Sequence, residues 1–378
     1  MPDNDPVAQK KMGRSIMANR THLVVMPGDG IGPEITAATL HVLRDVDRLL
    51  SLGLTYEDVP IGFAGLKAHG TTMPDASFEA AKRADGVILG PVSHNEYPPV
   101  DQGGLNPSGV MRKRLDLFAN IRPAKTRPGL PPLCGKLVDL VVVRENTEGF
   151  YADRNMFLGS ADIMPTPDLA ISMRKITREG STRIAETAFR LAMTRPRRKV
   201  TAVHKANVFR VSDGLFLECV RAVAARYPQI SYDEKIVDAM AALLVRDASV
   251  FDVIVTTNMF GDILSDEASE ISGSLGLAAS LNASHEHGVA QAQHGSAPDI
   301  AGQNRANPAS LIGSTAMLLA WLGERRSDER LTRAAELMER ALDATIVKPE
   351  WRTGDVGGTL GTKAFGERVA AVLTGLAK

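Results

Sequence analysis

Asp262 and Asp266 are the two residues whose type and spacing most directly suggest chemistry. They follow the apolar run 251–255, which is typical of a buried parallel strand, and Gly261 allows a turn into a helix. On that helix the carboxylates would share one face, where like charges one turn apart are unfavourable unless a cation lies between them. A hard divalent cation would suit, because it prefers carboxylate oxygens. The alternative is an aspartate N-cap followed by an exposed first-turn aspartate, and these residues alone do not decide between the two.

Three arginines are candidate binding groups for the carboxylates of a substrate. Arg112 and Arg122 flank the sequence LDLFAN, and Arg144 follows the apolar run 137–143. Guanidinium groups bind carboxylates through two parallel hydrogen bonds, so the three form a candidate clamp, although basic stretches are more often solvated. Tyr151 is a candidate proton donor if nearby cations lower its pKa, and the alternative is an exposed tyrosine in a polar loop.

A second set of candidates follows the apolar run 199–203. Lys205 stands where that strand would meet a site, and it is a candidate proton shuttle if cations or burial lower its pKa. Asp238 opens the helical pattern VDAMAALLV and adds a third carboxylate to the pair described above. We expect His204 to make structural hydrogen bonds rather than to act as a base.

Two glycine-containing stretches suggest close approach of a ligand to the backbone. The first, PGDGIGPE at 27–34, lacks both the G-x-G-x-x-G spacing of the dinucleotide fingerprint and the lysine of a P-loop. The second, HGSAPDIAGQNRANP at 294–308, places small residues such as Gly295 and Ala297 where a flat, phosphate-bearing cofactor can approach. Asp299 in this stretch would accept hydrogen bonds from both hydroxyls of an adenosine ribose and repel a 2′-phosphate.

Apolar runs alternate with helical patterns along the chain, which favours an α/β fold with parallel strands. The expected strands are 22–26, 86–90, 137–143, 199–203 and 251–255. The expected helices are 33–49, 107–118, 178–194, 213–226, 262–272, 308–322, 329–344 and 362–376.

Proline- and glycine-rich stretches at 121–135 and 272–276 are typical of crossings between two domains. We therefore expect a mobile tail, a large cofactor-binding domain in two segments, and a smaller domain that carries the dimer interface and the metal carboxylates. Their respective ranges are 1–20, 21–119 plus 275–378, and 120–274. Residues 152–170 are expected to form a loop or a projecting arm.

Composition excludes several classes of protein. The chain has 378 residues, and its 44 basic and 44 acidic residues leave no net charge to favour nucleic acid or an acidic membrane. The sequence shows no apolar run of the length of a membrane span and no secretory signal. Cys134 and Cys219 are the only cysteines, which excludes a disulfide framework and indicates a reducing, cytoplasmic compartment.

Taken together and in this order, the motifs resemble those of the β-decarboxylating dehydrogenases that act on isocitrate, homoisocitrate, 3-isopropylmalate and tartrate. The matching stretches cover residue 22 to the C-terminus and are GDGIGPE, the arginines around LDLFANIRP, RENTEGFY, HKAN, FDVIVTTN, GDILSD, HGSAPDIAG and GDVGG. The resemblance implies the family's own two-domain α/β fold with a mixed, largely parallel sheet, which is not a Rossmann fold. It also implies NAD-dependent oxidative decarboxylation of a 3-substituted malate with Mg²⁺ or Mn²⁺.

The resemblance implies roles for the matching residues around the substrate. Those that would hold its carboxylates and C3 substituent are Arg112, Arg122, Arg144, Asn106 and Ser108. Those that would hold the metal are Asp262 and Asp266, joined by Asp238 from the other subunit. Lys205 would reach in from that subunit as the proton relay with Asp238, and Tyr151 would be the proton donor. A homodimer with shared active sites is therefore implied as the minimum active unit.

The resemblance also implies an adenosine-binding loop. Its matching residues are His294, Gly295, Asp299, Ile300 and Asn307. Asp299 followed by Ile300 is similar to the NAD-using pattern, whereas NADP-using relatives tend to have Lys-Tyr there.

The substrate implied is a small hydroxy di- or tricarboxylate, and the helix before Arg112 bears on which one. 3-Isopropylmalate enzymes place two leucines three and four residues before this arginine, where this chain has Gly109 and Ser108. Isocitrate enzymes have serine six before and asparagine four before, and here Asn106 and Ser108 interchange those types. Because a polar pocket rejects an apolar substituent, we expect a polar C3 substituent like that of isocitrate or homoisocitrate. 3-Isopropylmalate and tartrate are the alternatives.

One residue near the predicted cofactor site departs from the family's pattern. Gln291 stands three residues before the HGSAPD histidine, where the family usually has glutamate, so one charge is lost near the cofactor. A non-catalytic regulatory subunit of an NAD-isocitrate dehydrogenase is the alternative from another functional class. Such subunits are expected to lose site residues, whereas the tyrosine, the lysine and all three aspartates are present here.

Overall fold

The computed structural model describes residues 20–151 and 161–377, so the tail expected at 1–20 lies, apart from residue 20, outside the described residues. The strands are β1 (Thr21–Met26), β2 (Leu54–Asp58), β3 (Gly86–Leu89), β4 (Ala119–Lys125), β5 (Asp139–Glu145), β6 (Asp162–Thr166), β7 (Leu169–Ser172), β8 (Lys199–His204), β9 (Ser231–Ile236), β10 (Val253–Thr256), β11 (Leu281–Ala283) and β12 (Gly288–Gln291). The α-helices are α2 (Gly32–Leu50), α3 (Gly62–His69), α4 (Asp75–Arg83), α5 (Pro107–Arg114), α6 (Arg178–Thr194), α7 (Ser212–Ala224), α8 (Val237–Asp247), α9 (Asn258–Ser272), α10 (Ala309–Arg326), α11 (Glu329–Ile346) and α12 (Thr362–Leu376).

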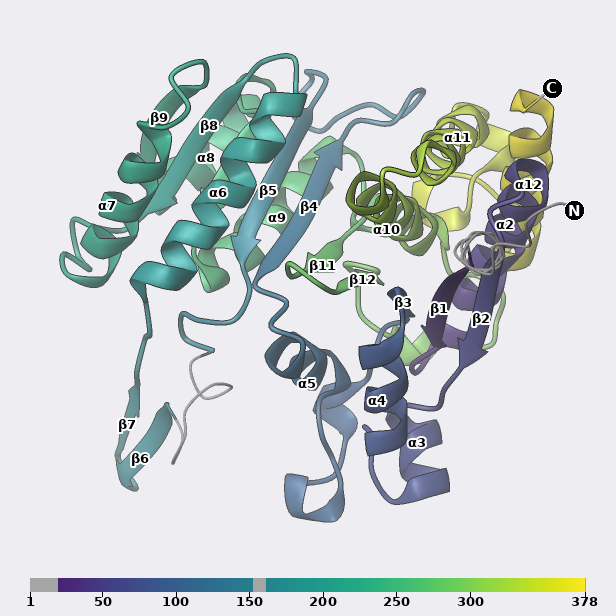
Figure 1. Ribbon diagram of the computed structural model, residues 1–378, viewed down its shortest axis with the longest axis horizontal. Coiled ribbons are helices and arrows are strands. Elements are labelled where there is room, and N and C mark those ends of the chain that lie inside the picture. The colour runs from purple at the N-terminus through teal and green to yellow at the C-terminus, as the bar shows by residue number, and fades with distance from the viewer. Residues whose placement is uncertain (1–19, 152–160, 378) are drawn as a thin grey trace, which may run out of the picture.

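One long sheet runs through the described part of the molecule, in the order β2-β1-β3-β12-β11-β4-β5-β10-β8-β9 (Figure 1). Within each end of the sheet neighbouring strands are parallel. In the middle, β11 pairs antiparallel with both β12 and β4, and β4 pairs antiparallel with β5. This arrangement confirms the expected mixed, largely parallel α/β fold. Parallel strands need crossover helices, which explains why helices cover both faces.

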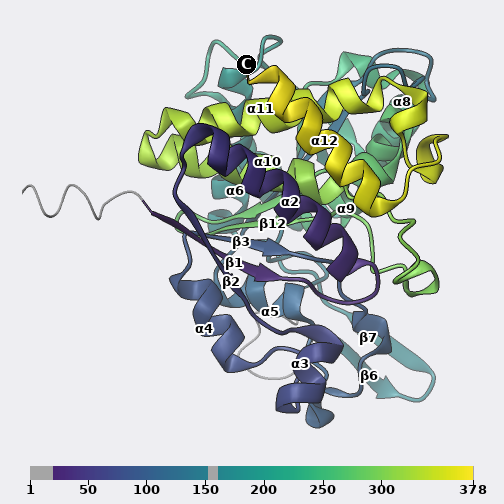
Figure 2. The same cartoon turned by 90° about the vertical axis from the view of Figure 1, so that its right-hand side faces the viewer.

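Alternation of side chains along the strands produces a separate core on each face. Val141 and Val143 of β5 pack with α6 and α7, whereas Leu140 and Val142 pack with α8 and α9. At the other end of the sheet, α2, α10, α11 and α12 cover one face, and α3 and α4 lie on the opposite side (Figure 2). The sheet is continuous between these ends, and the division into domains at 119/120 and 274/275 stays a prediction.

Several elements differ from the sequence expectation. The proline-containing stretch taken as a domain crossing begins with β4, in which Pro123 lies opposite Val141. Helix α9 begins at Asn258, so Gly261 is inside the helix and Asp262 lies beyond its first turn. Helix α5 ends at Arg114 rather than at 118.

The projecting arm expected at 152–170 is described only in part. Residues 152–160 lie outside the described residues, while β6 and β7 form a two-stranded hairpin that stands away from the body (Figure 1). Within the described residues, no helix is both long and apolar enough to cross a membrane.

Candidate active site

The antiparallel pairing of β4 with β5 brings two arginines together. Arg144 lies opposite Asn120, and Arg122 lies opposite Val142, so the two arginines are diagonal neighbours on one face of the sheet. That face is the one that α9 covers. Both side chains are almost completely buried, Arg144 at 1% exposure and Arg122 at 6%. A buried guanidinium group needs a carboxylate, and α9 supplies two.

The carboxylates of Asp262 and Asp266 converge on one nitrogen atom. Arg122 Nη1 lies 3.2 Å from Asp262 Oδ1 and 3.2 Å from Asp266 Oδ1, and it donates to Ser265 Oγ at 2.7 Å. Successive turns of α9 therefore place both aspartates on one face, as their spacing predicted. Their side chains are 36% and 50% exposed, which leaves carboxylate oxygens accessible to solvent. The donor set fits a hard divalent cation, although within the described residues of one chain no three acidic, histidine or cysteine side chains form a metal cluster.

Arg144 is held in place by α9. Its Nε donates to the backbone oxygen of Asn258 at 2.9 Å, its Nη2 donates to Asn258 Oδ1 at 2.7 Å, and its Nη1 pairs with Asp262. Gly261 makes this approach possible, because a Cβ there would lie 2.6 Å from Arg144 Cγ. The glycine is therefore required by close packing of the arginine, rather than by the turn expected from the sequence.

Electrostatics keep these groups charged at neutral pH. Burial, reinforced by the neighbouring Arg144, lowers the pKa of Arg122 to about 10. Burial alone would raise the pKa of Asp262, but Arg144, Arg122 and Arg112 together hold that pKa below its ordinary value. The carboxylate is therefore ionised wherever the protein is folded near neutral pH.

A cleft of about 310 Å³ lies here. The structure brings to it all five predicted substrate residues, the predicted proton donor and one predicted metal ligand: Asn106, Ser108, Arg112, Arg122, Arg144, Tyr151 and Asp262. Asp266 does not line this cleft. Tyr151 donates a hydrogen bond to Asp262 Oδ2 at 3.2 Å, which places its hydroxyl beside the carboxylate pair. Glu145 of RENTEGFY has a structural role, since it accepts from the backbone nitrogens of Thr147 and Glu148.

Lys205 and Asp238 do not line this cleft in the single chain. They form an ion pair with each other at the ends of β8 and β9, and the Asp238 side chain is 67% exposed. The backbone nitrogen of Lys205 donates to Asp213, which is fully buried and paired with Arg174. The backbone of the loop that carries Lys205 is thus fixed, while the side chains of Lys205 and Asp238 remain at the surface. His204 Nδ1 accepts from the nitrogen of Ala206 at 3.0 Å, the local structural role expected for it.

A second cavity of about 340 Å³ adjoins the cleft at His294 and Gly295. It is also lined by Ile300 and Asn307 of the predicted adenosine loop and by Ile31 of the GDGIGPE stretch. Asn307 Nδ2 is fixed by Asp355 Oδ2 at 3.0 Å. Asp299 is exposed and does not line this cavity, so the structure brings together four of the five predicted residues.

Two features of the cleft were not predicted from the sequence, namely Gln293 and the contact that Gln291 makes with Ser108. Gln293 Nε2 donates to Asp266 Oδ1 at 2.7 Å and to Ser269 Oγ at 3.2 Å, which orients the second aspartate. Gln291 Oε1 accepts from Ser108 Oγ at 3.1 Å and so contacts the predicted specificity helix. The departure from glutamate at 291 was visible in the sequence, but its contact with Ser108 was not.

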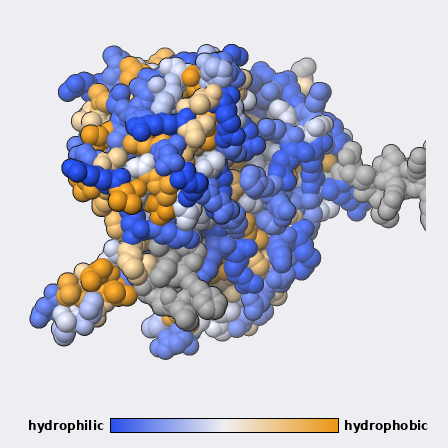
Figure 3. Space-filling view, turned by 60° about the vertical axis from the view of Figure 1, so that its left-hand side comes forward, coloured by the Kyte–Doolittle hydropathy of each residue, from blue (hydrophilic) through white to orange (hydrophobic). Residues whose placement is uncertain are grey.

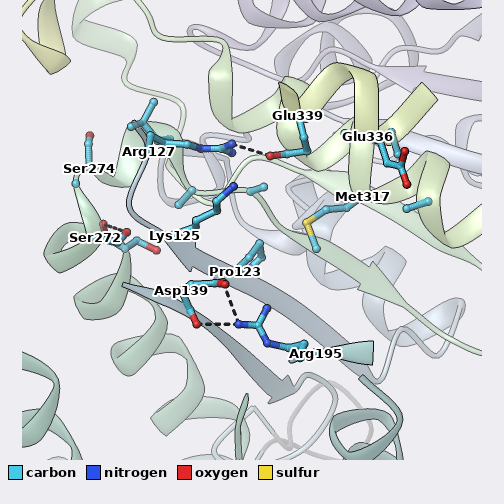
Figure 4. Close-up of a pocket in the computed structure, with 18 of the residues that line it drawn as sticks. Pro123, Lys125, Arg127, Asp139, Arg195, Ser272, Ser274, Met317, Glu336 and Glu339 are labelled. Carbon is cyan, nitrogen blue, oxygen red and sulfur yellow. Dashed lines mark hydrogen bonds and ion pairs between the residues drawn. The ribbon is translucent and has the colours of Figure 1, made fainter. Parts of the chain in front are cut away.

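A larger cavity, about 400 Å³, lies between β4 and helices α10 and α11 and shares no lining residue with the cleft (Figure 4). Its charged rim is engaged in ion pairs, Arg127 with Glu339 at 2.6 Å and Arg195 with Asp139 at 2.9 Å. Charges that neutralise one another in this way hold elements together, whereas the smaller cleft presents an excess of cations. The cleft is therefore the candidate active site.

Known proteins resemble this chain over nearly its whole length. The sequence profile of the isocitrate/isopropylmalate dehydrogenase family matches residues 22–369. A 3-isopropylmalate dehydrogenase of Methanothermobacter thermautotrophicus is 38% identical over 92% of this chain and 97% of its own length. An isocitrate/homoisocitrate dehydrogenase of Thermus thermophilus is 39% identical over 94% and 99%. The crystal structure of isocitrate dehydrogenase from Methylococcus capsulatus superposes with a TM-score of 0.82 at 36% identity, covering 93% of this chain and 99% of that one.

Proposed function

The chain belongs to the isocitrate/isopropylmalate dehydrogenase family, and on that premise we propose that it is an NAD-dependent enzyme that oxidatively decarboxylates a 3-substituted malate. The observation that carries the proposal is the convergence of Arg122, Arg144 and Asp262 in one cleft, with Asp266 paired to the same Arg122. The guanidinium groups of Arg112, Arg122 and Arg144 bind the malate carboxylates. Asp262 and Asp266 would hold Mg²⁺ or Mn²⁺, which would supply Lewis acidity at the C2 oxygen of the substrate.

Two side chains handle protons. Lys205, paired with Asp238, would relay the proton of the C2 hydroxyl away from the substrate, and bound NAD⁺ would supply the acceptor for the C2 hydride. Tyr151 gives a proton to C3 after carbon dioxide has left, and its hydrogen bond to Asp262 Oδ2 at 3.2 Å holds the hydroxyl beside the carboxylates. His294, Gly295, Ile300 and Asn307 would line the site for the adenosine half of NAD. Asp299 precedes Ile300 in the chain, and its carboxylate would repel the 2′-phosphate of NADP.

The proton relay requires a second copy of the chain. Lys205 and Asp238 lie outside the cleft of their own subunit, and each is accessible for docking against another molecule. Large apolar side chains are exposed near the site, including Ile263 on α9 at 58% and Val245 on α8 at 63%. The hairpin β6–β7 adds Met164 at 69%, and Figure 3 shows it as a projection with apolar surface. Apolar surface of this kind favours a homodimer that completes each cleft.

The first turn of α5 favours a polar C3 substituent. Asn106 and Ser108 face the cleft, and the Ser108 hydroxyl is engaged by Gln291. An isopropyl group would cover these polar atoms without replacing their hydrogen bonds to water. Isocitrate and homoisocitrate are therefore the preferred substrates, and 3-isopropylmalate is the alternative that several relatives' names suggest.

The test is a substrate panel. We expect isocitrate or homoisocitrate to give the highest kcat/KM with Mn²⁺ and NAD⁺, NADP⁺ to be used poorly, and one carbon dioxide to appear per NADH. A clear preference for 3-isopropylmalate would overturn the substrate assignment. A pure dimer without NADH production on any candidate would overturn the activity and identify a regulatory subunit.

A further inference from the structure

One buried carboxylate holds the segment that follows β3. Asp29 is 6% exposed, and its Oδ2 atom accepts hydrogen bonds from the backbone nitrogen of Ser93 at 3.0 Å and from the hydroxyl of Tyr97. Its Oδ1 atom accepts from the backbone nitrogen of Phe63 at 2.8 Å. No basic side chain of the described residues forms an ion pair with Asp29, so these three donors stabilise its buried charge.

The bonds to Asp29 Oδ2 close the turn that runs from Ser93 to Tyr97. The side chains of the three residues inside this turn, at 94–96, are exposed, so packing contributes little to its position. The ring of Tyr97 meets that of Phe63 edge to face, with 5.1 Å between the ring centres, and this contact orients the tyrosine. The position of the turn therefore depends on the hydrogen bonds to Asp29.

The same segment connects the walls of the two cavities of the site. Its residues that line the substrate cleft are Pro91, Val92 and His94. Ser93 does not line the cleft, and its hydroxyl lies 2.8 Å from Ser296 Oγ. The backbone oxygen of Ser296 in turn accepts from the backbone nitrogen of Ile31, which lines the predicted adenosine cavity, at 2.8 Å. A displacement of the cleft wall is thus transmitted to the wall of the cofactor cavity.

A dinucleotide cofactor would have to span both cavities, because its two halves serve the adenosine site and the reacting carbon. The two cavities share His294 and Gly295, which are close in sequence to Ser296. Transfer between bound reactants depends steeply on their alignment, and a misplacement of about 1 Å can lower a rate on the order of 100-fold. A wall that is fixed relative to both cavities would supply that alignment.

We propose that Asp29 and Tyr97 form a latch that positions the cleft wall at 91–94, and that the contact of Ser93 with Ser296 couples this wall to the cofactor cavity. The inference rests on the proposed function. It goes beyond that function because it assigns a positioning role to four side chains that line neither the cleft nor the adenosine cavity.

The first variant is Tyr97→Phe, which keeps the ring contact with Phe63 and removes only the hydroxyl that Asp29 accepts. Loss of a hydrogen bond to a charged group corresponds to about 10- to 100-fold in the equilibrium that holds the turn closed. With Mn²⁺, NAD⁺ and the best substrate of the panel, kcat should therefore fall on the order of 10-fold. The dissociation constant of that substrate with Mn²⁺, measured by calorimetry, should change by less than about threefold, because the three arginines are untouched.

Hydrogen exchange provides a readout that does not depend on turnover. In the ligand-free protein, amides in peptides covering 91–97 should exchange on the order of 10-fold faster in Tyr97→Phe than in the wild type, because the latched turn opens more readily. Peptides from α9 should exchange at the wild-type rate.

Two further variants separate the latch from general effects. Tyr56 has a buried hydroxyl without a hydrogen-bond partner in the part of the chain that the structure describes, so Tyr56→Phe removes the same atom and should leave kcat and exchange at 91–97 unchanged. Ser93→Ala keeps the backbone donor to Asp29 and removes only the contact with Ser296. It should raise KM for NAD⁺ by about three- to tenfold, the equivalent of one neutral hydrogen bond.

Each outcome decides a different claim. Unchanged exchange at 91–97 in Tyr97→Phe overturns the latch, and faster exchange with unchanged kcat shows that the latch is structural only and overturns its positioning role. An equal loss of kcat in Tyr56→Phe overturns it as well. An unchanged KM for NAD⁺ in Ser93→Ala overturns the coupling to the cofactor cavity. Inactivity of the wild type on every substrate refutes the proposed function, whereas the exchange rates still decide whether the latch exists.

Discussion

Replacement of Gly261 by alanine tests whether close packing of α9 against Arg144 shapes the site. A Cβ at 261 would lie 2.6 Å from Arg144 Cγ and 2.7 Å from its Cβ, closer than carbon atoms can approach. Arg144 is fixed by Asn258 and Asp262 and is 1% exposed, so it cannot swing aside. Either α9 or the guanidinium group must move.

Two opposing effects set the magnitude. Alanine improves helix propensity by about 1 kcal/mol over glycine. Overpacking costs about 1–3 kcal/mol, and each charged hydrogen bond that is lost costs about 1.5–3 kcal/mol more. We therefore expect Gly261→Ala to lower the free energy of unfolding by about 1–3 kcal/mol. Displacement of Arg144 should also lower kcat/KM by on the order of 10- to 100-fold.

Gly214 provides the matched control. It lies in the first turn of α7, where a Cβ would meet no atom within 4 Å, so Gly214→Ala should stabilise the protein by about 0.5–1 kcal/mol. Urea unfolding followed by circular dichroism measures both variants, with unchanged m-values as the check on comparability. Equal midpoints for the two variants, together with unchanged kinetics for Gly261→Ala, would refute the packing argument.

Three further predictions follow from the site and its supports. Lys205→Ala should abolish turnover while metal binding persists. Mixing this variant with Arg112→Ala should restore about a quarter or more of wild-type activity, since each heterodimer contains one complete cleft. Purified heterodimers without activity would contradict a shared site. Burial lowers the pKa of His294 in the folded protein, so the unfolded chain binds the proton more readily and stability falls as the pH drops below about 6.5. The urea midpoints at pH 7 and pH 5 should therefore differ less for His294→Gln than for the wild type. Arg127→Met leaves Glu339 and its neighbour Asp343 without their shared cation and should lower the free energy of unfolding by about 2–3 kcal/mol in the same urea assay. The expected cost is less than that for a fully buried pair, because Glu339 is 36% exposed. A decrease below about 0.5 kcal/mol would show that the ion pair is unimportant for stability.

Much of the fold was predictable where the periodicity of apolar residues and the glycine and proline residues that end an element indicate the same boundaries. The bounds of α6 and α12 match the expected ranges 178–194 and 362–376, since the apolar residues of each recur at helical spacing. Strand β4 was not predicted, because Pro123 and its surroundings are typical of a crossing; its pairing with β5 depends on a partner that the local sequence does not reveal. The start of α9 was placed four residues too late, because Gly261 indicated a turn although it serves close packing.

The candidate site, like the fold, could be predicted from the sequence only in part. The placement of Asp262 and Asp266 on one face follows from helical spacing, and the approach of Arg144 to Asp262 follows from the meeting of parallel strand ends at one edge. The orientation of Gln291 could not be predicted, because it depends on contacts between residues more than a hundred positions apart in the chain. The position of Lys205 relative to a cleft stays a prediction, since it concerns a second molecule.

Asn146 Nδ2 donates to Asn282 Oδ1 at 3.0 Å, and Asn282 Nδ2 donates to Gln291 Oε1 at 3.3 Å. This relay of amide side chains has a consequence for how substrate preference can evolve. Asn146 does not line the substrate cleft, yet it sets the direction of the hydrogen bonds that end at Gln291. An exchange at Asn146 can therefore reverse the polarity presented to a ligand while every wall residue stays the same. Two homologues with identical cleft walls can then differ in the metabolite they accept, and the responsible change lies in the layer behind the wall.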